Sequence, residues 1–170
     1  IMNDAHLHMV VNHFPIIGTI FGLGILITGI VLKNKTVKTV AYVLFIIAAL
    51  FGAFSMGTGE GAEELVEDMP SVGKQIIHEH EELAETFALL LYIIGAFSIL
   101  SIYFSIKKIV FEKYTSLLVV VLALVAVFFA KQVGTSGGEI RHTEIRDNAT
   151  AVGEVQSPSG AEQGEKEGDD

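Results

Sequence analysis

Four long apolar segments alternate with charged segments along this chain of 170 residues. The first segment, 14–32 (FPIIGTIFGLGILITGIVL), has 19 residues without a charge, which is enough to cross a hydrocarbon layer of about 30 Å as a helix. Two further apolar segments cover 37–56 and 86–106, and a shorter one with polar ends covers 114–132. The pattern predicts an all-α protein, a membrane four-helix bundle.

The two short connections between these segments carry clustered lysines. They are 33–38 (KNKTVK) and 107–113 (KKIVFEK). If all four segments cross a membrane, both connections lie on the same side, and the positive-inside rule places that side in the cytoplasm. We therefore expect both termini and the polar segment 57–85 to lie on the outer side.

The polar segment and the C-terminus are expected to differ in structure. Residues 60–69 are typical of a short acidic surface helix ending at Pro70, and Ser71 can cap a new helix that runs directly into the third span. This segment would form a helical cap outside the membrane. The residues after Arg146 (147–170) are acidic and poor in hydrophobic side chains, so we expect a disordered acidic tail following a transmembrane domain over 1–146.

The first span has a defined start and a stripe of glycines. Asn12 can cap the helix and Pro15 suits its first turn, where the missing N–H is harmless. Gly18, Gly22 and Gly29 form a stripe that allows another backbone or a flat ligand to approach closely. Helix packing is the commoner reason for such a stripe.

Composition agrees with a membrane protein and limits its chemistry. Apolar residues make up 51% of the chain, and the mean hydropathy is +0.53. The 20 acidic residues outnumber the 11 basic ones but gather in the polar segment and the tail, so we expect no nucleic-acid partner. The chain has no cysteine, which excludes thiolate metal sites, iron–sulfur clusters and covalent haem attachment to this chain.

All six histidines fall on the expected outer side, where they are candidates to hold a cofactor. They are His6, His8, His13, His78, His80 and His142. Histidines at a membrane boundary are functional candidates because burying an unpartnered imidazole is costly. We expect His13, which precedes Phe14 and Pro15, to be the most buried of the N-terminal three. A tight turn at Gly137–Gly138 would fold His142 back over the bundle.

His80 shares a helix face with the small residues Ala84, Ala88 and Gly95. An axial ligand of a membrane-embedded porphyrin needs such a groove, because the macrocycle must lie flat against the backbone. His78 points about 200° away around the helix and should meet solvent or a carboxylate such as Glu82. For any single histidine, the alternative is a polar side chain at the membrane interface without a ligand.

A second interpretation is a metal site formed by histidines and carboxylates. Glu139 and His142 form an E-x-x-H pair, as in di-iron bundles, although the second such motif of those bundles is missing. Zinc, copper or non-haem iron could be held by such groups. The candidates for this interpretation are His6, His78, Glu81, Glu82 and Glu139. The motifs of soluble hydrolases, nucleotide-binding proteins and zinc proteases are not found.

Several short motifs together resemble a family of small four-span bacterial membrane proteins classed as a domain of unknown function. They are His8-x-x-x-x-His13-Phe14-Pro15-Ile16, Thr58-Gly59, the histidine ahead of the third span, and Gly137-Gly138 with a following histidine. The family is often joined to, or encoded beside, c-type cytochromes. The resemblance implies a bacterial inner-membrane location, redox partners and b-type haem. This chain departs from the family at Glu139-Ile140-Arg141, where an aliphatic and aromatic run is expected.

The leading hypothesis is a membrane-bound b-type cytochrome with one or two haems near the outer face. Its candidate axial ligands are His13, His80, His142 and His8. It would carry electrons between a membrane donor such as quinol and an outer respiratory or c-type cytochrome partner, and need not be an enzyme by itself. The alternatives are an outward-facing His/Glu metal-binding protein and a cofactor-free structural subunit of a respiratory or transport complex.

Overall fold

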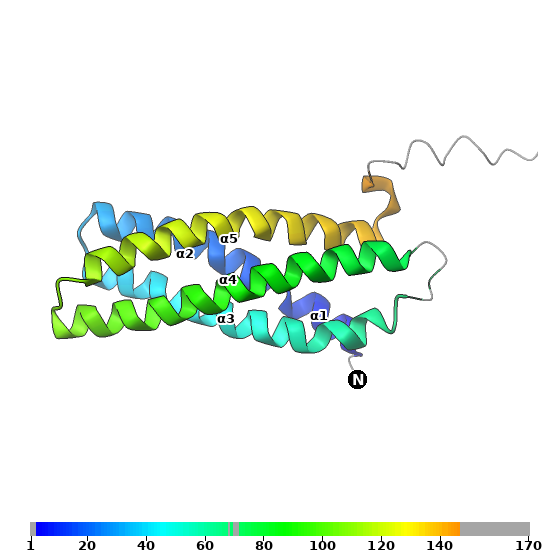
Figure 1. Ribbon diagram of the computed structural model, residues 1–170, viewed down its shortest axis with the longest axis horizontal. Coiled ribbons are helices and arrows are strands. Elements are labelled where there is room, and N and C mark those ends of the chain that lie inside the picture. The colour runs from blue at the N-terminus through cyan, green and yellow to red at the C-terminus, as the bar shows by residue number, and fades with distance from the viewer. Residues whose placement is uncertain (1–2, 68, 70–71, 147–170) are drawn as a thin grey trace, which may run out of the picture.

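The computed structural model describes residues 3–67, 69 and 72–146, and these form a bundle of four long helices (Figure 1). The long helices are α2 (His13–Val31), α3 (Lys35–Glu63), α4 (Lys74–Lys107) and α5 (Glu112–Arg141). A short helix, α1 (Asp4–Val11), precedes them, and a single 3₁₀ turn, η1 (Thr143–Ile145), follows them. The predicted all-α four-helix bundle is confirmed.

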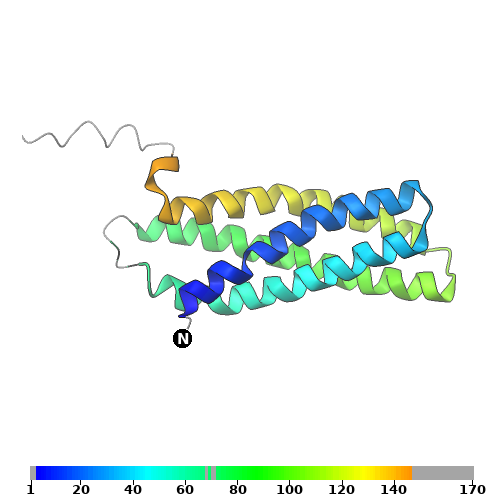
Figure 2. The same ribbon diagram turned by 180° about the vertical axis from the view of Figure 1, so that it is seen from behind.

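Each long helix packs against two neighbours, in the closed order α2, α3, α4, α5 and back to α2. Helix α1 continues the line of α2 beyond Asn12 and lies against the C-terminal part of α3 (Figure 2). The α2–α3 and α4–α5 connections therefore lie together at one end, which we call the lysine-rich end (33–38 and 107–113). Helix α1, the start of α4 and the end of α5 lie at the opposite end, which we call the histidine end (Figure 1).

The interior of the bundle contains side chains of very different sizes in close contact. Tyr42, Phe45, Leu91 and Val119 are fully buried, and alanines fill the remaining space where helices approach one another. Large apolar side chains also cover the outside of the bundle; Phe21, for example, is 64% exposed. Apolar side chains are expected both inside and outside a bundle that lipid surrounds. Water would favour their burial, but lipid does not.

Four helices are long and apolar enough to cross a membrane, which makes the chain a multi-pass membrane protein. The 34 residues of α4 would rise about 51 Å, which exceeds a hydrocarbon layer of about 30 Å. Its first turns, including His80, therefore lie beyond the apolar part of the span, 86–106. Helix α1 likewise precedes the apolar part of α2.

The predicted separate helix over 60–69 is wrong. Helix α3 continues through the polar segment as far as Glu63, and only 64–67 form turns. Gly61 lies within α3 and allows α1 to pack closely, because a Cβ atom there would lie 2.6 Å from the Asp4 carboxylate. The continuous helix from the polar segment into the third span is confirmed, beginning at Lys74 with Gly73 as its N-cap. The predicted cap Ser71, Pro70 and the tail 147–170 lie outside the described residues.

Two other local predictions are also wrong. Gly137 and Gly138 form no turn, because α5 continues in helical conformation to Arg141. Asn12 makes no side-chain cap hydrogen bond to α2, because the chain passes from α1 to α2 in nearly helical conformation; its Oδ1 atom is buried without a partner.

The glycine stripe of α2 is covered by α3. A Cβ atom at Gly18 would lie 3.1 Å from the Ala48 Cβ atom, and one at Gly22 would lie 2.9 Å from the Phe45 ring. Gly29 has the closest contact, because its Cβ atom would lie 2.8 Å from the backbone nitrogen of Lys38. The stripe therefore serves helix packing, the commoner of the two roles considered for it.

Candidate functional site

Two half-buried imidazoles lie at the histidine end, His8 from α1 and His80 from α4. Helix α3 packs against both of these helices and supplies the groups that hold His8. Helix α5 packs against α4 and supplies the group that holds His80. The other four histidines are exposed. Of the six histidines in the sequence, His8 and His80 are therefore the two that the fold partly buries.

The ring of His8 is fixed by two hydrogen bonds to α3. Its Nδ1 atom lies 3.0 Å from the Ser55 carbonyl oxygen and 3.1 Å from the Thr58 hydroxyl oxygen. A carbonyl oxygen can only accept, so Nδ1 carries the proton and donates it. In the neutral ring, Nε2 then keeps a free lone pair.

The ring of His80 is fixed in the same tautomer by α5. Its Nδ1 atom lies 2.9 Å from the Ser136 hydroxyl oxygen, and that hydroxyl donates to the Val133 carbonyl oxygen at 3.2 Å. The serine oxygen is therefore the acceptor of the His80 Nδ1–H, which again leaves Nε2 with a lone pair. Gly137 lets the ring lie against α5, since a Cβ atom there would come within 3.0 Å of the His80 Cε1 atom.

Both imidazoles are held in the neutral state. Burial lowers the pKa of His8, although its hydrogen bond to the Ser55 carbonyl opposes this shift. Burial also lowers the pKa of His80, and the positive charge of a protonated His8 lowers it further. Charge on one of the two rings therefore opposes charge on the other. Neutral imidazole is the form that binds a metal ion.

Protonation of this pair should destabilise the fold at mildly acidic pH. The unfolded chain binds protons with the usual histidine pKa of 6.5, whereas the folded pair has lowered pKa values. The stability that the pair contributes is therefore complete above that pH and is lost as the pH falls from about 6.5 toward the folded pKa values. We expect the melting temperature of the detergent-solubilised protein to fall between about pH 7.5 and 5.5.

Two double variants separate the contribution of His8 and His80 to this pH dependence from the contribution of the carboxylates. The double variant His8→Gln, His80→Gln should lose part of the pH dependence, and the exposed pair His6→Gln, His142→Gln should keep all of it. Equal slopes in the two double variants would contradict the assignment.

The prediction that His13 is the most buried of the three N-terminal histidines is wrong. His13 is exposed, and its Nδ1 atom donates to the Met9 carbonyl oxygen at 2.8 Å. His8 is the buried one, because five helical residues correspond to about 500°, which leaves His8 and His13 roughly 140° apart around the helix. His6 is exposed on the same side as His13.

His142 does not fold back over the bundle, because α5 carries it outward to the helix end. It is exposed, and its Nδ1 atom lies 2.9 Å from the Glu144 carboxylate. The backbone N–H of Glu144 and the His142 ring lower the pKa of that carboxyl. The carboxylate that contacts His142 is thus Glu144 and not Glu139, its E-x-x-H partner in the sequence; the Glu139 carbonyl oxygen accepts from Arg146.

His78 meets solvent and carboxylates on the polar face of α4, as predicted. This exposed ring lies 3.4 Å from a Glu82 carboxylate oxygen and 3.9 Å from one of Glu81. Within the described part of the chain, no group of three or more histidines and carboxylates is placed to hold a metal ion. The His/Glu interpretation therefore gains no geometric support from these residues.

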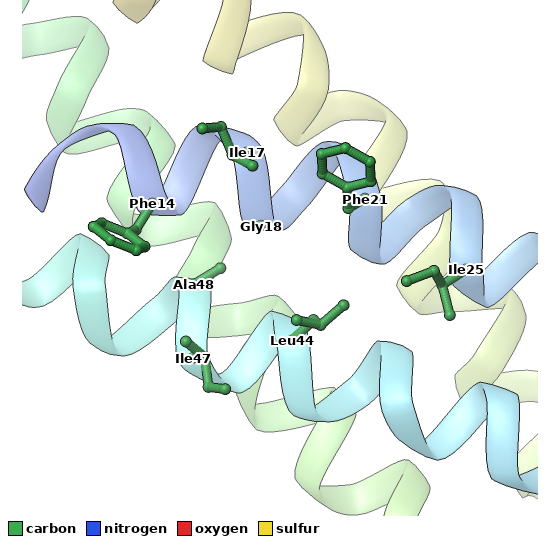
Figure 3. A pocket seen from close by; sticks show the side chains of 8 residues that line it. All are labelled: Phe14, Ile17, Gly18, Phe21, Ile25, Leu44, Ile47 and Ala48. Carbon is green, nitrogen blue, oxygen red and sulfur yellow. The ribbon is translucent and has the colours of Figure 1, made fainter.

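The small residues below His80 face the interior as predicted. Ala84 is half-buried and Ala88 is buried, and a Cβ atom at Gly95 would lie 3.0 Å from the Ala49 Cβ atom of α3. A separate groove of about 340 Å³ lies between α2 and α3, and its lining is almost entirely apolar (Figure 3). It is lined by Phe14, Ile17, Gly18, Phe21, Ile25, Leu44, Ile47 and Ala48. No histidine lines this groove, so it is distinct from the His8–His80 pair.

Three polar residues of the site were not predicted as such. Ser55 and Ser136 were missed, and Thr58 appeared only within a short motif. The available signal was their position: each is a small polar residue near the histidine end of an apolar helix, where a hydroxyl without a partner would be unfavourable.

No protein-family model, curated protein or solved structure matches this chain. The fold and its apolar exterior define the class, a multi-pass membrane protein built as a four-helix bundle. Within this bundle, His8 and His80 are the two half-buried histidines, and each is hydrogen-bonded to a neighbouring helix.

Proposed function

We propose that this protein is a membrane-bound b-type cytochrome in which His8 and His80 would hold a haem. One observation carries the proposal: two half-buried imidazoles from different helices each place Nδ1 within hydrogen-bond distance of an oxygen of a neighbouring helix, so that Nε2 is the nitrogen left to bind a metal. A histidine that ligates a metal characteristically donates its other ring N–H to a carbonyl, carboxylate or water, which fixes the tautomer and raises the basicity of the ligand. The chemistry of this donor pair fits haem iron.

The chain's own residues would hold and orient the ligands. Ser55 and Thr58 fix the His8 ring, and Ser136 fixes the His80 ring. Gly137 gives the His80 ring room against α5. Bound haem b would supply one-electron redox chemistry, and the protein environment would tune its potential. This proposal replaces His13 and His142, which are exposed, by His8 as the partner of His80.

The location and the partners belong to the same proposal. The lysine-rich end favours a cytoplasmic position by the positive-inside rule, so the histidine end and both termini would face the periplasm of a bacterial inner membrane. A membrane quinol is the proposed electron donor, and a c-type cytochrome or another respiratory subunit is the proposed acceptor. The resemblance to a family found beside c-type cytochromes supports this choice of partners.

A reduced-minus-oxidised absorption spectrum tests the proposal. Wild-type protein purified after haem-replete expression should show Soret and alpha bands, and His8→Ala and His80→Ala should each lose most of the haem, because the remaining imidazole is left without its partner. The exposed histidines provide matched controls, since His6→Ala and His142→Ala should retain the bands. A wild-type protein without these bands would refute the proposal.

Elemental analysis of the same samples separates the alternatives. Iron in equal amount to haem supports the cytochrome, whereas bound zinc or copper without a Soret band supports a metal-binding protein. Unchanged bands in both His8→Ala and His80→Ala would assign the haem to other residues.

A further inference from the structure

The lysine-rich end carries a strong and largely unpaired positive charge. Its two connections contain six lysines and one glutamate, which gives a net charge of +5 (six minus one). The glutamate, Glu112, forms an ion pair with Lys38, and both side chains are largely buried. The other five lysines are exposed, and none of them forms an ion pair with a carboxylate of the described residues. They are Lys33, Lys35, Lys107, Lys108 and Lys113.

These five lysines form one surface because the two connections are tied together. The Lys38–Glu112 ion pair links the start of α3 to the start of α5. Both connections lie at the same end of the bundle in both views (Figures 1 and 2). Exposed aromatic side chains surround this end, among them Tyr103, Phe111 and Tyr114. Aromatic residues in this position are typical of the boundary between hydrocarbon and headgroups.

Two of the lysines are held in an unfavourable backbone conformation. Lys33 has φ 49° and Lys108 has φ 53°, and they are the only non-glycine residues with positive φ in the described chain. Lys33 follows Leu32, the C-cap of α2, and Lys108 is the C-cap of α4. Glycine is the usual residue in left-handed conformation at such helix ends. This conformation carries a free-energy cost for lysine, because its Cβ atom comes close to the following carbonyl oxygen. Favourable interaction with the helix dipole offsets part of this cost but does not require lysine at both positions.

We propose that the lysine-rich end is a binding site for the phosphate groups of anionic phospholipids. The charge is complementary to these headgroups, and the position at the hydrocarbon boundary makes a membrane lipid, and not a free phosphate, the natural source. Juxtamembrane lysines are known to attract anionic lipid in this way, each contributing about fivefold in affinity. Glycine would relieve the strain at positions 33 and 108, but only lysine provides an ammonium group that can bind a phosphate there. This site is independent of the proposed haem.

The backbone strain supplies a variant that should fold well and bind poorly. The double variant Lys33→Gly, Lys108→Gly removes two charges and relieves the positive φ at both positions. In uncharged detergent, its melting temperature should equal or exceed that of the wild type. Its affinity for phosphatidylglycerol, titrated into the same detergent, should be about 25-fold weaker, since two contributions of about fivefold are lost.

The controls separate lipid binding from general charge effects. The variant Lys74→Gln, Lys131→Gln removes the same charge from residues outside the lysine-rich end and should bind phosphatidylglycerol as the wild type does. Phosphatidylcholine and inorganic phosphate should not raise the melting temperature, and 0.5 M salt should reduce the effect of phosphatidylglycerol. An equal effect of the two lipids, or full binding by the glycine variant, would overturn the proposal. An effect of inorganic phosphate alone would show a phosphate site and not a lipid site.

Discussion

Replacing Glu112 by alanine is expected to lower the free energy of unfolding by about 3–5 kcal/mol. Glu112 accepts hydrogen bonds from Lys38, from the Ser116 hydroxyl at 3.0 Å and from the fully buried Tyr42 hydroxyl at 3.4 Å. The side chains of Lys38 and Glu112 are only 13% and 15% exposed. Removing the carboxylate leaves a lysine without a counter-charge between helices, at the edge of the hydrocarbon. Reversible unfolding by titration with sodium dodecyl sulfate measures the effect.

Two comparisons show whether the buried charge is the cause. The double variant Lys38→Met, Glu112→Leu removes both charges and should recover most of the lost stability, because an apolar pair of similar volume has no unpaired charge to bury. The exposed pair Lys74–Glu67, at 3.6 Å, offers a matched control, and Glu67→Ala should change stability by less than about 1 kcal/mol. If Glu112→Ala and Glu67→Ala had similar effects, the ion pair would not be the link between α3 and α5 that its burial indicates.

The sequence predicts the spans well but not the polar contacts between them. Hydropathy identifies segments such as 14–32 and 86–106 because lipid requires a continuous apolar length in each helix, which is a local property. The Lys38–Glu112 pair joins residues 74 positions apart, so no local pattern reveals it. In the sequence, Lys38 is only one of the lysines of the 33–38 connection, and nothing there points to Glu112 as its partner.

The candidate site was predicted only in part, because its contacts also join residues that are distant in the sequence. The sequence indicates that the histidines gather at one end, since this depends only on the number of crossings. Which imidazoles are buried depends on helix rotation: His8 turns toward α3, whereas His13 lies roughly 140° away and stays exposed. The packing role of Gly137 likewise depends on a residue of another helix, because a Cβ atom there would lie 3.0 Å from the His80 Cε1 atom. Such contacts are set by packing and not by the sequence around either residue.

Replacing Gly29 by alanine is expected to destabilise the bundle by about 1–3 kcal/mol, through overpacking at the closest approach of α2 and α3. A Cβ atom at Gly29 would lie 2.8 Å from the Lys38 backbone nitrogen and 3.2 Å from its Cα atom. Backbone atoms cannot move aside as a flexible side chain can, so the two helices must separate. The separation would also disturb Lys38, whose ion pair with Glu112 joins α3 to α5. Leucine at this position should be worse than alanine.

Gly24 provides the matched control on the same helix, because a Cβ atom there would meet nothing within 4 Å. Gly24→Ala should be neutral or stabilise the protein by up to about 1 kcal/mol, since alanine favours the helix more than glycine does. The two variants add the same methyl group to the same helix and differ only in what that group meets. Opposite signs in a detergent unfolding titration would therefore identify the α2–α3 contact as the cause. Equal effects would mean that helix propensity, and not close packing at Lys38, governs the glycines of α2.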